Sequence, residues 1–199
     1  MTTGADFRDG FAALVLAAGS ASRFGGGKLW APYAGQPLLH HALAAARAAP
    51  VASIVVVTGA DAEAVAACAR AFDPAVRLAH APDHAEGMAA SLRAGIAAVP
   101  ETAAAAFVFL GDMPRVPHAV LAPLAEAVAA GAPAAAPTFD GRRGNPVVLA
   151  RSVFQAVSTL TGDVGARPIL QRLGARLALV EATDDGVLFD VDEPGDLDR

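Results

Sequence analysis

The feature that most constrains the fold is an alternation of short apolar runs with helical patterns across the first two-thirds of the 199-residue chain. The apolar runs are short and continuous, which is typical of strands buried on both faces of a parallel sheet. We expect strands at 12–17, 53–58, 76–79 and 105–110, and helices at 38–48, 61–71, 88–99 and 118–130. This order predicts βαβ units, and therefore a mostly parallel sheet between two layers of helices, a three-layer α/β/α Rossmann-like sandwich.

The last third is less regular, but it holds no linker that would separate a second domain. We expect short strands at 134–137, 146–149, 177–180 and 187–191, and a helix at 165–173. Residues 1–199 are therefore expected to form a single domain.

Composition argues against several classes of protein. No apolar run reaches the roughly 18 residues that a membrane span needs. Residues 1–10 lack the basic start and apolar core of a secretory signal, so a cytoplasmic location is expected. Cys68 is the only cysteine, which excludes an internal disulfide and a zinc cluster of cysteines. With a net charge of −5 and no general basic surface, the chain is not expected to bind nucleic acid.

A glycine-rich loop directly follows the first expected strand. It runs from Gly19 through Arg23 and three consecutive glycines to Lys28, the only lysine among 15 basic residues. At the end of a strand, such a loop can bring backbone N–H groups to a polyphosphate while the two cations neutralise it. Leu29 after the lysine excludes a Walker A motif, and Trp30 in place of a third glycine excludes a dinucleotide fingerprint. A flexible surface loop is the alternative.

A carboxylate follows the most apolar expected strand. Gly111 and Asp112 come directly after the run at 105–110, which puts Asp112 at the same edge of the sheet as the glycine-rich loop. Mg²⁺ on phosphates usually takes one or two protein carboxylates, so Asp112 is the candidate metal ligand. Asp190 or Asp192, on one side of an extended segment, could complete the site. A cap on the following helix is the alternative role for Asp112.

Three further segments could contact ligands. Gly87 opens an expected helix whose first N–H groups, together with Ser91, could hold a base edge, a ribose or a phosphate. Arg143 and Asn145 precede a short strand, and Asp163 precedes another helix; these two segments could bind an anionic acceptor. A helix start, a hairpin turn and a helix cap are the structural alternatives. No histidine forms a visible triad with a serine, so an activated nucleophile is not expected.

Taken together, the segments LAAGSASRFGGGK, AEGMAASLRAG, FLGDMP, RRGNPVVL, GDVGAR and DVDEPGDL resemble the MobA-like NTP transferase family. The likeness spans residues 12–197 and is greatest to the branch that contains molybdenum cofactor cytidylyltransferase. It implies the nucleotide-diphospho-sugar transferase fold and the Mg²⁺-dependent transfer of a nucleotidyl group from an NTP to an acceptor phosphate, with loss of pyrophosphate. Ala18, where guanylyltransferases of the group commonly have glycine, favours CTP. Related sequences usually have methionine at the position of Phe24, and cytidylyltransferases often have histidine at the position of Asn145. The loop that contains Asn145 would face the acceptor.

The resemblance implies that Arg23 and Lys28 bind the triphosphate and act in catalysis with Asp112, and that Asp112 and Asp190 coordinate the metal. Motif reasoning and resemblance together assign contacts with nucleotide or acceptor to Leu16, Ala17, Ala18, Gly19, Ser22, Arg23, Lys28, Gly87, Ser91, Gly111, Arg143, Asn145 and Asp163. The implied acceptor is molybdopterin, and a molybdoenzyme would receive the product. Two alternatives stay open: transfer from GTP or to another phosphorylated acceptor, and a non-catalytic factor that binds molybdenum cofactor.

Overall fold

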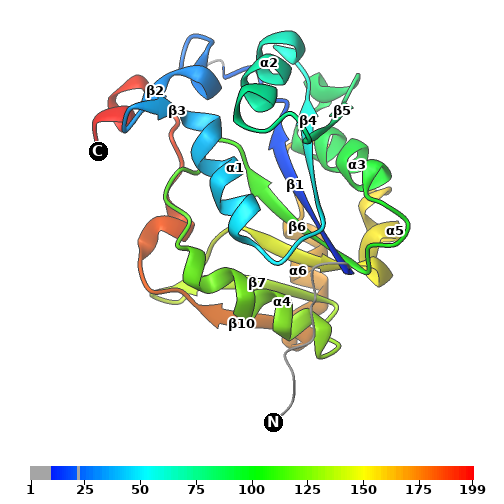
Figure 1. The fold of residues 1–199 in the computed structure, drawn as a ribbon. Coiled ribbons are helices and arrows are strands. Elements are labelled where there is room, and N and C mark those ends of the chain that lie inside the picture. The colour runs from blue at the N-terminus through cyan, green and yellow to red at the C-terminus, as the bar shows by residue number, and fades with distance from the viewer. Residues whose placement is uncertain (1–9, 22) are drawn as a thin grey trace.

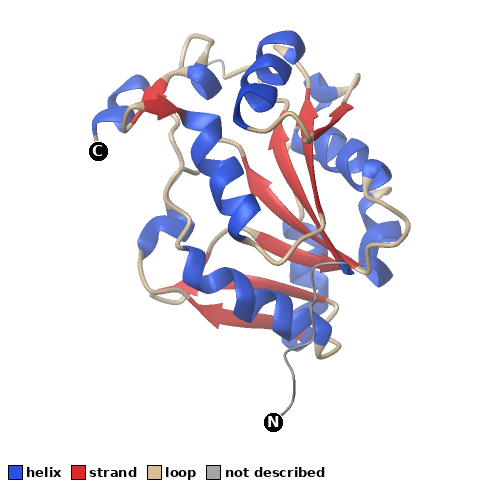
Figure 2. Cartoon of the chain, in the orientation of Figure 1, coloured by secondary structure: helices blue, strands red, loops and turns tan. Residues whose placement is uncertain are grey.

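The computed structural model describes residues 10–21 and 23–199, and its centre is an eight-stranded, mostly parallel sheet (Figures 1 and 2). Seven strands lie in the order β10-β7-β9-β6-β1-β4-β5, and β8 pairs with β7. The strands of the sheet are β1 (Phe11–Ala17), β4 (Ser53–Thr58), β5 (Arg77–His80), β6 (Ala105–Leu110), β7 (Ala134–Phe139), β8 (Arg142–Arg143), β9 (Val147–Ala150) and β10 (Leu177–Glu181). Only β8 and β9 run antiparallel to their neighbours.

The helices are α1 (Leu38–Ala48), α2 (Ala62–Phe72), α3 (Met88–Ala98), α4 (Leu121–Ala129), α5 (Phe154–Val157) and α6 (Arg167–Leu173). A two-stranded ribbon of β2 (Pro32–Tyr33) and β3 (Gln36–Pro37) lies beside the C-terminal turn, which is red in Figure 1. Short 3₁₀ turns complete the described chain: Lys28–Trp30, His84–Glu86, His118–Val120, Arg151–Val153, Gly174–Arg176, Asp185–Leu188 and Pro194–Asp198. Among the described residues, no helix is long and apolar enough to cross a lipid bilayer.

Strand β1 is the centre of the core because both of its faces are covered. All of its residues are buried, and it pairs in parallel with β4 on one side and β6 on the other. Ala13 and Val15 pack into the core formed with α1, α2 and α4, whereas Leu14 and Leu16 pack into the core formed with α3, α5 and α6. The predicted three-layer α/β/α sandwich is therefore confirmed.

The predicted elements agree best where a buried apolar run decides the structure. The expected bounds of α1, β4 and β6 match the observed ones, and Asp61 precedes α2 as expected, although its side chain makes no capping hydrogen bond. The strand predicted at 187–191 is wrong: a 3₁₀ turn ends at Leu188, and the following residues are irregular. The backbone there bonds to loops rather than to a strand, since Val187 O accepts from Asn145 N–H and Val191 N–H donates to Asp112 O.

We expect Phe107→Ala to lower the free energy of unfolding by about 3–5 kcal/mol, because it removes a fully buried ring and leaves a cavity. The ring lies between those of Phe11 and Phe109, at centroid distances of 6.0 and 5.8 Å. Urea denaturation followed by circular dichroism measures the change. Leu179→Ala, at a side chain that is 60% exposed on β10, is the control and should stay within about 0.5 kcal/mol. Equal effects of the two substitutions would contradict the described core.

Candidate active site

Two adjoining cavities lie at the carboxyl ends of β1 and β6. The larger, of about 660 Å³, is lined by Leu16, Ala18, Gly19, Ser20, His84, Ala85, Glu86, Gly87, Met88, Ser91, Leu110, Asp112, Asp163, Asp190 and Asp192. The smaller, of about 310 Å³, is lined by Leu16, Met88, Leu92, Val108, Leu110, Arg143, Gly144, Asn145, Val147, Asp163, Val164, Gly165, Ala166, Arg167 and Leu170. Leu16, Met88, Leu110 and Asp163 line both cavities, so the two cavities share one wall.

The pairing of β1 with β6 brings the two predicted loops together. Leu16 lies opposite Leu110 in the ladder, and Gly111 N–H donates to Leu16 O at 2.9 Å. A Cβ atom on Gly111 would lie 3.0 Å from that same oxygen, so glycine permits this close approach. As a result, Gly19 and Asp112 line the same cavity, as the sequence predicted.

Lys28 and Asp112 form a direct, half-buried ion pair. Lys28 Nζ donates to Asp112 Oδ2 and to Val191 O, each at 2.7 Å, and lies 3.8 Å from Asp192 Oδ1. The lysine side chain is 11% exposed, so its charge is poorly screened by water. The sequence predicted phosphate binding for Lys28 and metal binding for Asp112 as two separate roles. In the structure the two side chains are in direct contact.

The glycine-rich loop uses part of its own backbone. The N–H groups of Phe24, Gly25 and Gly26 converge on Ala21 O at 3.0 to 3.3 Å, so these three amides are already bonded inside the loop. Three successive glycines with φ between 73° and 92° allow this conformation, which L side chains rarely adopt. Arg23, with a side chain 76% exposed, lies at the rim and pairs with Asp192 at 3.5 Å. The N–H groups of residues 24–26 are therefore already used in this conformation, and phosphate binding by Gly19, Arg23 and Lys28 stays a prediction.

Asp190 faces two other carboxylates across the larger cavity. Partial burial is the largest cause that raises the pKa of Asp190, and the negative charges of Asp192 and Asp112 raise it further against a weaker opposing effect of Lys28. Carboxylate oxygens are the ligands that Mg²⁺ and Mn²⁺ prefer. Among the described residues, no group of three or more His, Cys, Asp or Glu side chains is arranged to hold a metal. A cation here would therefore need oxygens from water or a phosphate, which is the usual coordination of Mg²⁺ beside nucleotides.

The first turn of α3 is bonded to the segment that contains Asp163. Met88 N–H donates to Asp163 Oδ1 at 3.1 Å, and Ala89 N–H donates to Gly162 O at 3.0 Å. Gly87, with φ of 113°, packs against the same segment. In this conformation the N–H groups of Met88 and Ala89 are therefore used by this segment, whereas Gly87 and Ser91 line the larger cavity and their contact with a ligand stays a prediction. Asp163 is a helix cap that also lines both cavities.

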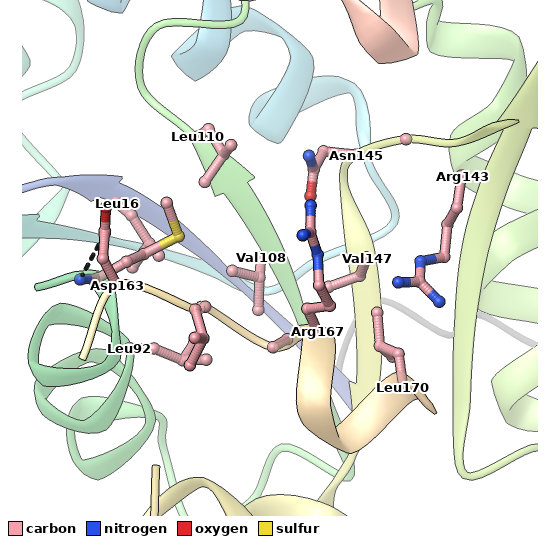
Figure 3. Close-up of a pocket in the computed structure, with 15 residues that line it drawn as sticks. Leu16, Leu92, Val108, Leu110, Arg143, Asn145, Val147, Asp163, Arg167 and Leu170 are labelled. Atoms are coloured by element: carbon pink, nitrogen blue, oxygen red, sulfur yellow. Dashed lines mark hydrogen bonds between the residues drawn. The ribbon is translucent and has the colours of Figure 1, made fainter. Parts of the chain in front are cut away.

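The smaller cavity combines an apolar floor with a polar rim (Figure 3). Figure 3 shows Arg167 extending from the start of α6 toward Asn145, with Arg143 approaching from β8. The hairpin turn, the structural alternative for this segment, is present, because β8 pairs antiparallel with β7. The floor consists of Leu92, Val108, Val147 and Leu170 together with the shared Leu16 and Leu110.

The structure gathers most of the predicted contact residues around the two cavities. Those that line one or both are Leu16, Ala18, Gly19, Gly87, Ser91, Asp112, Arg143, Asn145, Asp163 and Asp190. Lys28 bonds to a lining residue, whereas Ala17 is buried in the core with α1, and Gly111 supports the cavity through its backbone. Ser22 lies outside the described residues. The motif analysis missed Ser20, His84 and Met88, and it singled out the segment of Arg167 without assigning that residue a contact.

Comparison with known proteins identifies the family of the chain. The family model of the MobA-like NTP transferase domain matches residues 13–177. Nicotine blue oxidoreductase from Paenarthrobacter nicotinovorans is 34% identical over 187 residues, which cover 90% of each chain. Among solved structures, Rv0371c from Mycobacterium tuberculosis H37Rv superimposes with a TM-score of 0.85 at 29% identity, covering 96% of this chain and 97% of that one. Its complex with manganese gives a TM-score of 0.75 at 26% identity, covering 88% and 89%.

The chain belongs to the MobA-like NTP transferase family. Its sheet and helix layers are those of the nucleotide-diphospho-sugar transferase fold. The family is one of nucleotidyltransferases, whose substrates are small nucleotides.

We expect Asp190→Asn to stabilise the metal-free protein near pH 7.5 and to lose that advantage toward about pH 4. The sign follows from the raised pKa of Asp190: the ionised carboxyl destabilises the folded state above that pKa, and protonation removes the penalty as the pH falls. Thermal denaturation in a chelating buffer, repeated across this pH range, measures the effect. Asp61→Asn, at an exposed position before α2, is the control for the change in net charge. A pH-independent difference between Asp190→Asn and the wild type would contradict the electrostatic account.

Proposed function

We propose that the protein transfers CMP from CTP to an acceptor phosphate and releases pyrophosphate, with a molybdopterin-type compound as the acceptor. The observation that carries the proposal is the pair of adjoining cavities with a shared wall. One is lined by carboxylates and the glycine-rich loop, and the other joins an apolar floor to two arginines. This arrangement suits two substrates whose reacting phosphates meet at the wall.

The larger cavity is the proposed nucleotide site. Ala18 is 2% exposed and lines this cavity, and its methyl group takes space that glycine would leave open. A smaller base site favours a pyrimidine over a purine, in agreement with CTP. Ser20, beside Gly19, adds a hydroxyl group at the same end of the cavity.

Asp112 and Asp190 are the proposed ligands of a divalent cation. Asp192 is the less suitable ligand, since its side chain is 50% exposed, against 25% for that of Asp112. The manganese complex of Rv0371c supports a divalent cation at a related fold. When bound, such a cation would neutralise phosphate charge and make the α-phosphorus more electrophilic.

Lys28 supplies the second positive charge. Its ammonium group has three donors and is bonded to Asp112 and Val191, so a small rotation would turn it toward a bound triphosphate. In the proposed reaction an acceptor phosphate oxygen bonds to the α-phosphorus while the bond to the β-phosphate oxygen breaks. Lys28, with Arg23 at the rim, would stabilise the charge on the departing pyrophosphate. No covalent intermediate with the protein is required.

The smaller cavity is the proposed acceptor site. Arg143 and Arg167 offer guanidinium groups that can bind a phosphate through two hydrogen bonds each. The apolar floor suits a flat ring system, and Asn145 can hydrogen-bond to its polar edge. A ring joined to a phosphate, as in molybdopterin, has both parts.

We expect Asp112→Ala to lower the rate of pyrophosphate release at least about 100-fold while the fold is kept. Lys28→Ala should instead weaken CTP binding about 10-fold, because it removes charge-assisted hydrogen bonds to the triphosphate. Pyrophosphate release measures the first effect. The fluorescence of Trp30, the only tryptophan and near to Lys28 in sequence, measures the second. Asp61→Ala is the control, and normal turnover by folded Asp112→Ala would disprove the role of Asp112.

We expect Arg167→Gln to raise the KM for the acceptor about 10-fold and to leave the KM for CTP unchanged, since it removes a charged partner of the acceptor phosphate only. Steady-state kinetics with each substrate varied in turn separates the two constants. Arg172→Gln on the same helix, at an exposed position outside both cavities, is the matched control. A rise in the KM for CTP alone would reverse the assignment of the two cavities.

A second candidate is the reduction of a conjugated ring compound. It is favoured by the name of the 34% identical relative, an oxidoreductase, and by the apolar floor of the smaller cavity. Bleaching of nicotine blue with a reduced nicotinamide cofactor, in the absence of any NTP, tests it. Bleaching without pyrophosphate release would favour the oxidoreductase. Binding of CTP or of the acceptor, with neither reaction, would indicate a non-catalytic factor that binds molybdenum cofactor.

A further inference from the structure

The backbone around Asp190 has no strand to fix it. Residues 185–191, which we call the Asp190 segment, form a 3₁₀ turn followed by irregular chain. Two loops contact the backbone of this segment: Gly186 is in close contact with Arg115 O, and Val187 O accepts from Asn145 N–H at 2.9 Å. The position of the Asp190 carboxylate therefore depends on side chains and loops rather than on the sheet.

Asp190 shares the larger cavity with Asp112 and Asp192, so its carboxylate is repelled by two others of the same charge. On the C-terminal side, the backbone of Val191 resists this repulsion, because its N–H donates to Asp112 O at 3.0 Å and its carbonyl accepts from Lys28 Nζ. On the N-terminal side, Asp190 follows Phe189, whose side chain packs against the cluster of Tyr33, Leu38 and Val191.

Arg115 also contacts the Phe189 ring. Its guanidinium carbon lies 4.1 Å from the centre of the Phe189 ring, next to Asp190 in the chain. Its Nε–H donates to Tyr33 Oη at 2.6 Å, and the Tyr33 ring meets His41 of α1 edge-on at 5.3 Å. Tyr33 is only 7% exposed, so Arg115 is fixed to a rigid part of the fold.

We propose that Arg115 is a positioning residue that holds Asp190 beside Asp112, so that the two carboxylates can share one divalent cation. The inference rests on the proposed function, which makes these two residues the metal ligands. Arg115 is not among the residues that line either cavity, so it acts through Phe189 rather than on a ligand. Residues 111–115 then supply both the first metal ligand and the group that places the second.

The test is the binding of manganese chloride, with and without CTP, followed by the electron paramagnetic resonance signal of free Mn²⁺. We expect Arg115→Lys to bind Mn²⁺ about 10-fold more weakly than the wild type, as is typical when a residue that orients a ligand is lost. Lysine keeps the charge but loses the planar stacking group and the Nε–H. The matched control is Arg47→Lys, because Arg47 also stacks on a ring, that of Phe72 at 4.4 Å, in a different part of the molecule. It should bind Mn²⁺ normally.

Two further variants separate positioning from a general loss of stability. Phe189→Leu should weaken Mn²⁺ binding as Arg115→Lys does, and Phe189→Tyr, which keeps an aromatic ring, should restore it. CTP affinity without metal should stay unchanged in all of them. Wild-type binding with equal Mn²⁺ affinity in Arg115→Lys would overturn the positioning role alone. A wild type that binds no Mn²⁺ even with CTP would overturn both this role and the metal site of the proposed function.

Discussion

The pairing of β1 with β6 is the constraint on which the candidate site depends. Both strands are buried on both faces, so a slip by one residue would exchange the side chains of the two cores. The register therefore fixes Leu16 opposite Leu110, and the bond from Gly111 to Leu16 O closes the end of the pair. Two loops far apart in sequence leave the sheet at one level, and their charged groups meet there.

At this end of the sheet the carboxylates of Asp112 and Asp192 lie around the ammonium group of Lys28. Lys28 is the only lysine of the chain and contacts Asp112, Asp192 and Val191 O within 3.8 Å. A compact ammonium with three donors can serve partners in three directions, whereas the planar fork of an arginine suits one flat partner. This difference explains a lysine at that point in a chain whose other cations are arginines.

The sequence predicts what local patterns decide and misses what distant contacts decide. The runs that form β4 and β6, and the helix α1, are apolar enough to define their own ends. The segment at 187–191 has a strand-like pattern as well, and Val187 and Val191 are buried, but its backbone bonds to two loops rather than to a strand. Asp163 caps α3 by bonding to Met88, 75 positions away, and Lys28 pairs with Asp112, 84 positions away. No local sequence pattern predicts either contact.

The wall between the two cavities has a thermodynamic consequence. Met88 and Asp163 line both cavities and are bonded to each other at 3.1 Å, so they form one unit seen from two sides. If the two cavities hold two substrates, as proposed, a molecule that orders this unit from one side would lower the entropy cost of binding the second. Any coupling free energy of that kind would be the same whichever molecule binds first.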